Sequence, residues 1–262
     1  MGKEIAMKIA TFNVNSIRSR LPIVLSWLKK NKPDIMCLQE TKVQDHDFPV
    51  QPFTDAGYQT AYRGEKSYNG VAIASLQKPQ ELKFGFNDGL STDESRLIAA
   101  KTGNIHVVNT YVPQGREIEH AMFKYKLKWF ERLRKFFDRN FKRGDKLIWV
   151  GDLNIAPETI DIYNAATQEN HVCYHKDART AFEKTKQWGF IDIFRKYHPE
   201  PGQYSYYDYR TLDAVGRKMG WRVDHILATE SLAKKSTDCY IDLKPRLEHK
   251  PSDHTVMVAE FT

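Results

Sequence analysis

The chain has 262 residues, of which 41% are hydrophobic, 12% aromatic and 28% charged, an ordinary globular composition with enough apolar material for a large core. Its net charge of +7 and pI of about 9.1 favour polyanionic partners such as nucleic acid or an anionic membrane. No apolar run reaches the roughly 18 residues of a membrane span, and the first residues lack the apolar stretch of a signal peptide, which argues against a membrane partner.

The composition is uniform along the chain, with no Gly/Ser-rich or Pro-rich linker. We therefore expect one domain over residues 1–262, with residues 1–6 as an N-terminal extension, and a monomer. The only cysteines are Cys37, Cys173 and Cys239, an odd number at wide spacing. This favours free thiols in a reducing compartment over a disulfide framework, and hence a soluble, cytoplasmic protein.

The first third of the chain predicts three strands and one helix. Residues 7–14 form a short apolar strand, and the spacing of Leu21, Val24, Leu25 and Leu28 predicts an amphipathic helix after it. Pro33 and Asp34 end that segment, and residues 35–38 are predicted as a buried strand. The dipeptide Asn69-Gly70 indicates a turn into a strand over residues 71–75.

The remainder of the chain alternates between strands and helices. Residues 97–101 and 105–112 are predicted as a hairpin, residues 147–150, 223–228 and 256–261 as further strands, and residues 116–139 and 177–188 as helices. Residues 159–173 show little pattern, and we expect a surface loop there. Hairpins combined with long helices predict a mixed α/β sandwich, because pure βαβ alternation does not describe the hairpin region.

Polar or acidic residues repeatedly follow the short apolar runs. Asn13 and Asn15 follow the first run, Glu40 the second, and Asp152 with Asn154 the run at 147–150, while Asp224 and Asp253 border the last two. If these strand ends align, four carboxylates share one rim and need a cation to neutralise them. Oxygen ligands favour Mg²⁺, Ca²⁺ or Mn²⁺, and the combination suits phosphodiester hydrolysis. Each residue alone is more typical of a turn or a helix cap.

Eight segments, in order, identify a family that these residues resemble. The chain is similar to the exonuclease III type of AP endonucleases, within the endonuclease/exonuclease/phosphatase superfamily. The segments are TFNVNSIR (11–18), PDIMCLQETK (33–42), ESRLI (94–98), NTYVPQG (109–115), GDLNIAP (151–157), YSYYDYR (204–210), GWRVDHILA (220–228) and PSDH (251–254). The resemblance implies a four-layer α/β sandwich, with two mixed β-sheets packed face to face and flanked by helices.

The resemblance also implies roles for single residues. Glu40 would ligate Mg²⁺, with Mn²⁺ as a substitute, Asn13 close by, and Asn15 and Asp253 assisting. Tyr111 would contact the scissile phosphate or assist the leaving group. Asp152 would either activate water or protonate the leaving 3′ oxygen, and Asn154 would hold Asp152 and the phosphate. His254 would bind a phosphate oxygen or act as a base, oriented by Asp224.

The implied substrate is double-stranded DNA with abasic sites, cut on the 5′ side of the lesion to leave a 3′-OH. Accompanying 3′→5′ exonuclease and 3′-end-cleaning activities are also expected. Tyr206, Trp221 and Val223 match positions that wall a pocket for the extruded sugar, although aromatic residues in strands are commonly core residues. Arg96 and Arg116 are expected to contact the DNA backbone. The alternating His171, Cys173 and His175 could suggest zinc, but three ligands without a CxxC partner favour surface loop residues.

Three alternative functions compete with this interpretation. One is a phosphatase or phosphodiesterase of the same superfamily that acts on a small or lipid phosphoester. Another is a non-specific, metal-dependent nuclease, which would cut undamaged duplex equally well. The third is a DNA-binding protein without activity, against which the complete set of acidic and histidine residues argues.

Overall fold

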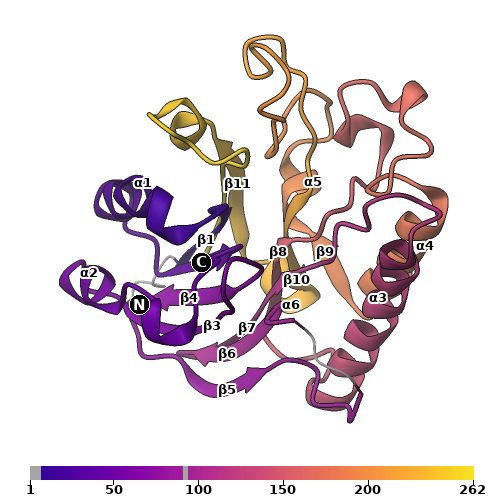
Figure 1. Ribbon diagram of the computed structural model, residues 1–262. Helices are drawn as coiled ribbons and strands as arrows, with labels where there is room; N and C mark the ends of the chain where they lie inside the picture. Colours follow the sequence, from indigo (N-terminus) through magenta and orange to yellow (C-terminus); the bar gives the residue numbers. More distant parts are fainter. Residues whose placement is uncertain (1–6, 91–93) are drawn as a thin grey trace.

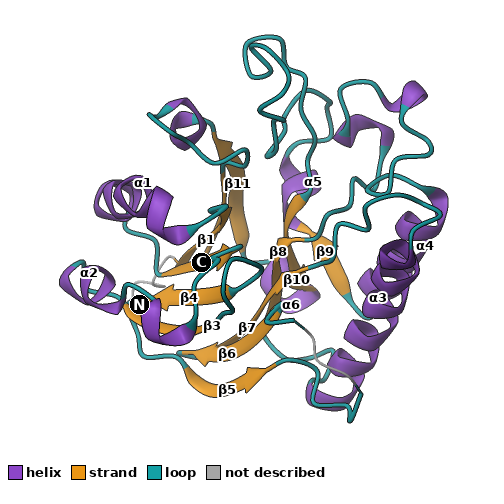
Figure 2. Cartoon of the chain, in the orientation of Figure 1, coloured by secondary structure: helices purple, strands orange, loops and turns teal. Residues whose placement is uncertain are grey.

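The computed structural model describes residues 7–90 and 94–262, so the predicted extension of residues 1–6 lies outside it. Two six-stranded sheets form its centre (Figures 1 and 2). The first runs in the order β11 (Ser236–Asp242), β12 (Val256–Phe261), β1 (Met7–Asn13), β2 (Ile35–Gln39), β4 (Val71–Ser75), β3 (Gln59–Arg63). The second runs in the order β5 (Gln80–Phe84), β6 (Leu97–Thr102), β7 (Ile105–Tyr111), β8 (Leu147–Asp152), β10 (Asp224–Thr229), β9 (Phe190–Asp192).

The sheets are mixed and pack face to face. Only β1 with β2 and β7 with β8 pair in parallel among the described strands, and the other neighbours are antiparallel. One apolar cluster fills the space between the sheets, with Ile9 and Ile73 from the first sheet and Val107 and Ile148 from the second. Alternate residues of a strand face opposite sides, so the outer faces need their own cover.

Helices provide that cover and complete the predicted four layers. On the first sheet, α1 (Ile17–Asn31) buries Val24 and Leu28, and α2 (Val50–Asp55) buries Phe53. On the second sheet, α3 (Ala121–Asn140) and α4 (Lys176–Lys186) bury a cluster rich in aromatic residues. The short helices α5 (Ile193–Tyr197) and α6 (Glu230–Ala233) join the last strands. The predicted sandwich is therefore confirmed (Figure 2).

The helix predicted over residues 116–139 begins later than expected. Arg116 has φ 60°, in the left-handed region that an α-helix excludes. The His120 side chain then accepts a hydrogen bond from the Met122 N–H and caps α3, which starts at Ala121. The apolar spacing that predicted the helix lies wholly within α3, so the error concerns the boundary alone.

The segment predicted as a surface loop at residues 159–173 is partly built into the core. It contains two short 3₁₀ helices, η2 (Thr159–Asp161) and η3 (Ala165–Thr167). Ile162, Val172 and Cys173 are buried in the cluster under α3 and α4. Cys173 is thus a core residue, which corrects the surface assignment of the alternating His–Cys–His motif.

All three cysteines are free, as predicted, and all three are buried. Among the described residues, no helix combines the length and apolar character needed to cross a bilayer.

Candidate active site

The carboxyl ends of two parallel strand pairs place polar residues at one end of the sandwich. Asn13 ends β1, and Glu40 follows β2 directly. In the second sheet, Tyr111 ends β7 and is paired in register with Asp152, which ends β8. Asp224, the first residue of β10, pairs with Asp152 from the other side. The predicted alignment of strand ends on one rim is therefore present.

A glycine is needed next to the central aspartate. Gly151 has φ +135°, and a Cβ built on it would lie 2.0 Å from the Thr110 carbonyl oxygen of the neighbouring strand. Any side chain at this position would force β7 and β8 apart just before Tyr111 and Asp152.

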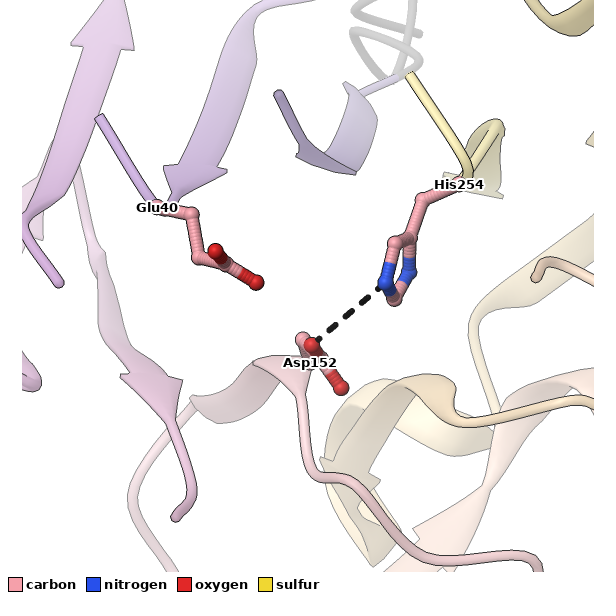
Figure 3. A group of neighbouring side chains, drawn as sticks. All are labelled: Glu40, Asp152 and His254. Carbon is pink, nitrogen blue, oxygen red and sulfur yellow. Dashed lines mark ion pairs between the residues drawn. The ribbon is translucent and has the colours of Figure 1, made fainter. Parts of the chain in front are cut away.

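Glu40, Asp152 and His254 come together at this rim, with one nitrogen or oxygen atom from each lying within 4.8 Å of the others, which is the spacing found around a metal ion. Figure 3 shows Glu40 and His254 approaching Asp152 from opposite sides. The Asn13 amide nitrogen lies between the two carboxylates, 2.7 Å from Glu40 Oε1 and 2.9 Å from Asp152 Oδ2. Its oxygen accepts from the Asn15 N–H at 3.0 Å, so Asn13 orients both carboxylates.

Glu40 is held in its ionised form. Its backbone is left-handed, with φ 52°, which is uncommon for a glutamate and marks a functional constraint. Burial alone would raise the pKa of Glu40, but the Lys42 ammonium, 2.8 Å away, and the Asn13 amide together hold it below its usual value. Sequence reasoning missed Lys42 as a site residue, although it lies inside the quoted segment at 33–42.

Asn15 and Asp253 lie beside this group rather than in it. The Asn15 amide donates to Asp253 Oδ1 at 3.0 Å, and the Lys42 ammonium donates to Asn15 Oδ1 at 2.6 Å. The two residues predicted as auxiliary metal ligands thus bind each other, and Asn15 also binds the lysine that pairs with Glu40.

Asp152 is buried, with 1% of its surface exposed, and is held by its neighbours. Its Oδ1 accepts from the backbone N–H of Asn154 at 2.9 Å, and its Oδ2 accepts from the Asn154 amide at 3.3 Å. Burial raises the pKa of Asp152 to about 7; the Asp224 and Glu40 carboxylates act in the same direction, while His254 opposes them. A carboxyl group with that pKa exchanges protons readily near neutral pH.

His254 is paired with Asp224 as predicted. Its Nδ1 lies 2.8 Å from Asp224 Oδ2, and its Nε2 lies 3.7 Å from Asp152 Oδ2. Burial alone would lower the pKa of His254, but the Asp224 and Asp152 carboxylates raise it to about 10. The ring is therefore an imidazolium at neutral pH, suited to bind an anionic oxygen rather than a metal.

Replacing Asp224 with asparagine is expected to lower the pKa of His254 markedly, because burial then outweighs the remaining attraction of Asp152. An NMR titration of the imidazole in metal-free protein measures this directly. Asp238→Asn, at an exposed position on β11, should leave the His254 titration unchanged. An unaltered His254 pKa in the Asp224 variant would contradict the pairing.

Tyr111 and Arg96 are stacked together. The Arg96 guanidinium lies 4.6 Å from the centre of the Tyr111 ring, donates to the Tyr111 carbonyl oxygen at 3.4 Å and pairs with Glu94 at 2.8 Å. Burial, and next the Glu40 carboxylate, raise the pKa of Tyr111, so its hydroxyl keeps its proton. Arg96 is only 8% exposed and packs on Tyr111, whereas Arg116 is exposed.

An apolar wall flanks the acidic group. A cleft of about 360 Å³ runs from Glu40 and His254 to Trp221 and Val223. Tyr206 lines it with its ring 5.0 Å from that of His254, and His171 packs on Trp221 with the ring centres 4.5 Å apart. The three residues predicted as pocket walls therefore line this cleft, although Trp221 and Val223 also belong to the core.

These features define a metal-assisted phosphoester hydrolase site on a two-sheet sandwich. A model of the Endonuclease/Exonuclease/phosphatase family matches residues 10–254, and the chain belongs to this family.

Similar proteins of known structure or annotation agree with that assignment. An AP endonuclease from Archaeoglobus fulgidus is 51% identical, with a TM-score of 0.95 over 97% of this chain and 99% of that one. A 3′ phosphatase from Neisseria, bound to a product DNA hairpin, is 38% identical, with a TM-score of 0.94 over 98% and 99%. Exodeoxyribonuclease III of Haemophilus influenzae is 31% identical over 97% of this chain and 100% of that protein. These relatives confirm the predicted exonuclease III type and hydrolase class.

Proposed function

We propose that this protein is a DNA-repair phosphodiesterase that hydrolyses the backbone on the 5′ side of abasic sites in double-stranded DNA, leaving a 3′-OH. The observation that carries the proposal is the acidic group of Glu40 and Asp152 opening into a cleft walled by Trp221 and Val223. An abasic nucleotide costs least to extrude, because its base is already missing. The similarity to an AP endonuclease and an exodeoxyribonuclease supports the same substrate class.

The donor set fits Mg²⁺, with Mn²⁺ as a substitute. Glu40 supplies an ionised oxygen ligand, and the Asn13 side chain lies beside it. Mg²⁺ is usually held by one or two carboxylates and completes its shell with water and substrate phosphate. When bound, the ion would neutralise charge on the phosphoryl group.

The remaining residues supply binding and proton transfer. The His254 imidazolium binds a phosphate oxygen, and Asp224 fixes its ring. Asp152, held by Asn154, moves the proton, either from the attacking water or to the leaving 3′ oxygen. The protonated Tyr111 hydroxyl donates to the phosphate or the leaving oxygen. Arg116 contacts the DNA backbone from the exposed edge of the site.

Removal of 3′-terminal blocking groups and 3′→5′ exonuclease activity are proposed as companion activities. Each needs the same attack on a phosphorus atom next to a 3′ oxygen. The similarity to a Neisseria protein described as a 3′ phosphatase favours the first of them.

We expect a single Mg²⁺-dependent cut immediately 5′ to the lesion in a labelled duplex carrying one tetrahydrofuran abasic analogue. An undamaged duplex of the same sequence serves as the control, and each is run with Mg²⁺ and with EDTA. Equal cutting of both duplexes would replace the proposal with a non-specific nuclease. No cutting of either would direct attention to small phosphoesters or to binding without catalysis.

A further inference from the structure

A lysine with no surface exposure lies beneath the active site. Lys126 projects from α3, and its ammonium donates to three backbone carbonyl oxygens: Gln114 at 3.1 Å, Asn154 at 2.6 Å and Val172 at 2.8 Å. Burying an ammonium group is strongly unfavourable unless its donors are satisfied. The three carbonyls use all three N–H donors of the lysine.

The three carbonyls belong to separate loops that build the cleft. Gln114 follows Tyr111 after β7, and Asn154 follows Asp152 after β8. Val172 lies between His171 and Cys173, whose side chains line the cleft. The Lys126 side chain therefore connects three segments: the loop after β7, the loop after β8 and the segment at Val172 beside the cleft.

The bond to Asn154 bears directly on the central aspartate. Asn154 has a left-handed backbone, with φ 48°, and its N–H and amide both donate to Asp152. Its carbonyl oxygen, held by Lys126, fixes the same residue from the opposite side. The Cys173 thiol adds a weak contact to Asn154 Oδ1 at 3.8 Å. The orientation of Asn154 thus depends on groups outside the catalytic set.

We infer that Lys126 is a positioning residue for the reaction: its ammonium ties the three loops together and so holds Asn154 and Asp152 in their working geometry. This inference rests on the proposed function. A displacement of about 1 Å at catalytic groups can reduce a rate by about 10²-fold. Loss of Lys126 should therefore lower kcat. KM should change little, because the exposed residues proposed to bind DNA are not altered.

The kinetic test compares Lys126→Met with wild type on the abasic duplex with Mg²⁺. We expect kcat to fall by about 10–10²-fold while KM changes by less than about threefold. Lys126→Arg, which keeps the charge and the donors, should recover part of the loss. Lys135→Met, on the exposed face of the same helix, is the matched control and should equal wild type. An unchanged kcat in Lys126→Met would overturn the inference.

Hydrogen–deuterium exchange separates positioning from general stability and needs no activity. In Lys126→Met, amides of residues 112–116, 153–156 and 171–175 should exchange faster, while those of α1 and β12 keep their rates. Unchanged exchange in the three loops, or equal acceleration everywhere, would overturn the inference.

If Lys126→Met does not fold, Lys126→Gln takes its place with the same expectations. A wild-type protein that cuts no duplex would defeat the proposed function and the kinetic role together, whereas the exchange result would still show whether Lys126 ties the loops.

Discussion

Replacing Asp152 with asparagine is expected to reduce cleavage of the abasic duplex by about 10²–10⁴-fold, the usual contribution of a general acid or base. The change keeps the size of the side chain and removes the group whose pKa lies at about 7. Proton transfer from the attacking water and proton transfer to the leaving 3′ oxygen both depend on that group. The loss is therefore expected whether Asp152 acts as base or acid. Because Glu40 and His254 are unchanged, binding of the abasic duplex should persist.

Single-turnover cleavage with saturating enzyme measures the effect on the chemical step, and a gel-shift assay with the same duplex measures binding. Asp208→Asn is the matched control, because Asp208 lines the same cleft but pairs with Arg210 at its rim. We expect that variant to cleave within a few-fold of wild type. A rate for Asp152→Asn within tenfold of wild type would exclude Asp152 as the proton-transferring residue.

The three central groups of the site hold different protonation states side by side. Lys42 and Asn13 keep Glu40 ionised, and Asp224 keeps His254 protonated. Asp152 lies between them with a pKa of about 7, because burial and two neighbouring carboxylates oppose its ionisation. The site therefore combines an anionic Glu40, a cationic His254 and an Asp152 whose pKa is near neutral, a combination that suits the proposed phosphodiester hydrolysis.

The central strands could be predicted from sequence, and the edge strands could not. All eight predicted strands are present, with ends that differ by a few residues. The four that escaped prediction, β3, β5, β9 and β11, are the outermost strands of the two sheets. A central strand of a covered sheet is apolar on both faces and appears as a continuous apolar run. Edge strands such as β5, QELKF, are largely exposed and carry no such signal.

The residues proposed to be catalytic could be singled out from sequence because each lies inside a motif with ordered neighbours, and the structure brings them together. The residues that hold these side chains in place could not be predicted, because their contacts join segments far apart in the chain. Lys126 resembles any lysine of an amphipathic helix, and its burial follows only from three loops meeting above α3. Arg96 shows the same limit, since its position in a motif did not reveal that it packs on Tyr111. The roles assigned to the site residues from sequence, like the single domain and the monomer, stay predictions.

A second large effect is expected from a charged network behind the cleft wall. Arg222, with no exposed surface, lies between Trp221 and Val223 in the chain but does not line the cleft with them. Its guanidinium donates to Asp161 at 2.6 Å and to Asp192 at 2.9 Å, and its backbone N–H donates to the Asp161 carbonyl oxygen at 2.8 Å. Removing one partner of a buried ion pair leaves the other charge uncompensated.

Arg222→Met is therefore expected to lower the free energy of unfolding at neutral pH by about 3–5 kcal/mol. Urea unfolding followed by tryptophan fluorescence measures the loss. Arg217→Met, at an exposed position, is the control and should stay within about 0.5 kcal/mol of wild type. A loss below about 1 kcal/mol for Arg222→Met would mean that well-packed apolar contacts replace the network without penalty.

The same network predicts a dependence of stability on pH. Burial alone would raise the pKa values of Asp161 and Asp192, but Arg222 and neighbouring cations hold both below their usual values. Because an unfolded aspartate titrates near about 3.9, the stabilisation is complete above about pH 5 and is lost as the pH falls through the folded pKa values. In Arg222→Met, Asp161 keeps Arg195 and Asp192 keeps His225, but burial is opposed less strongly, so the pKa values of both aspartates rise. Protonation at low pH then relieves the uncompensated part of their charge. The stability difference between wild type and Arg222→Met should therefore shrink between about pH 5 and pH 3. A difference that stays constant over that range would show that the effect of Arg222 comes from packing rather than from its charge.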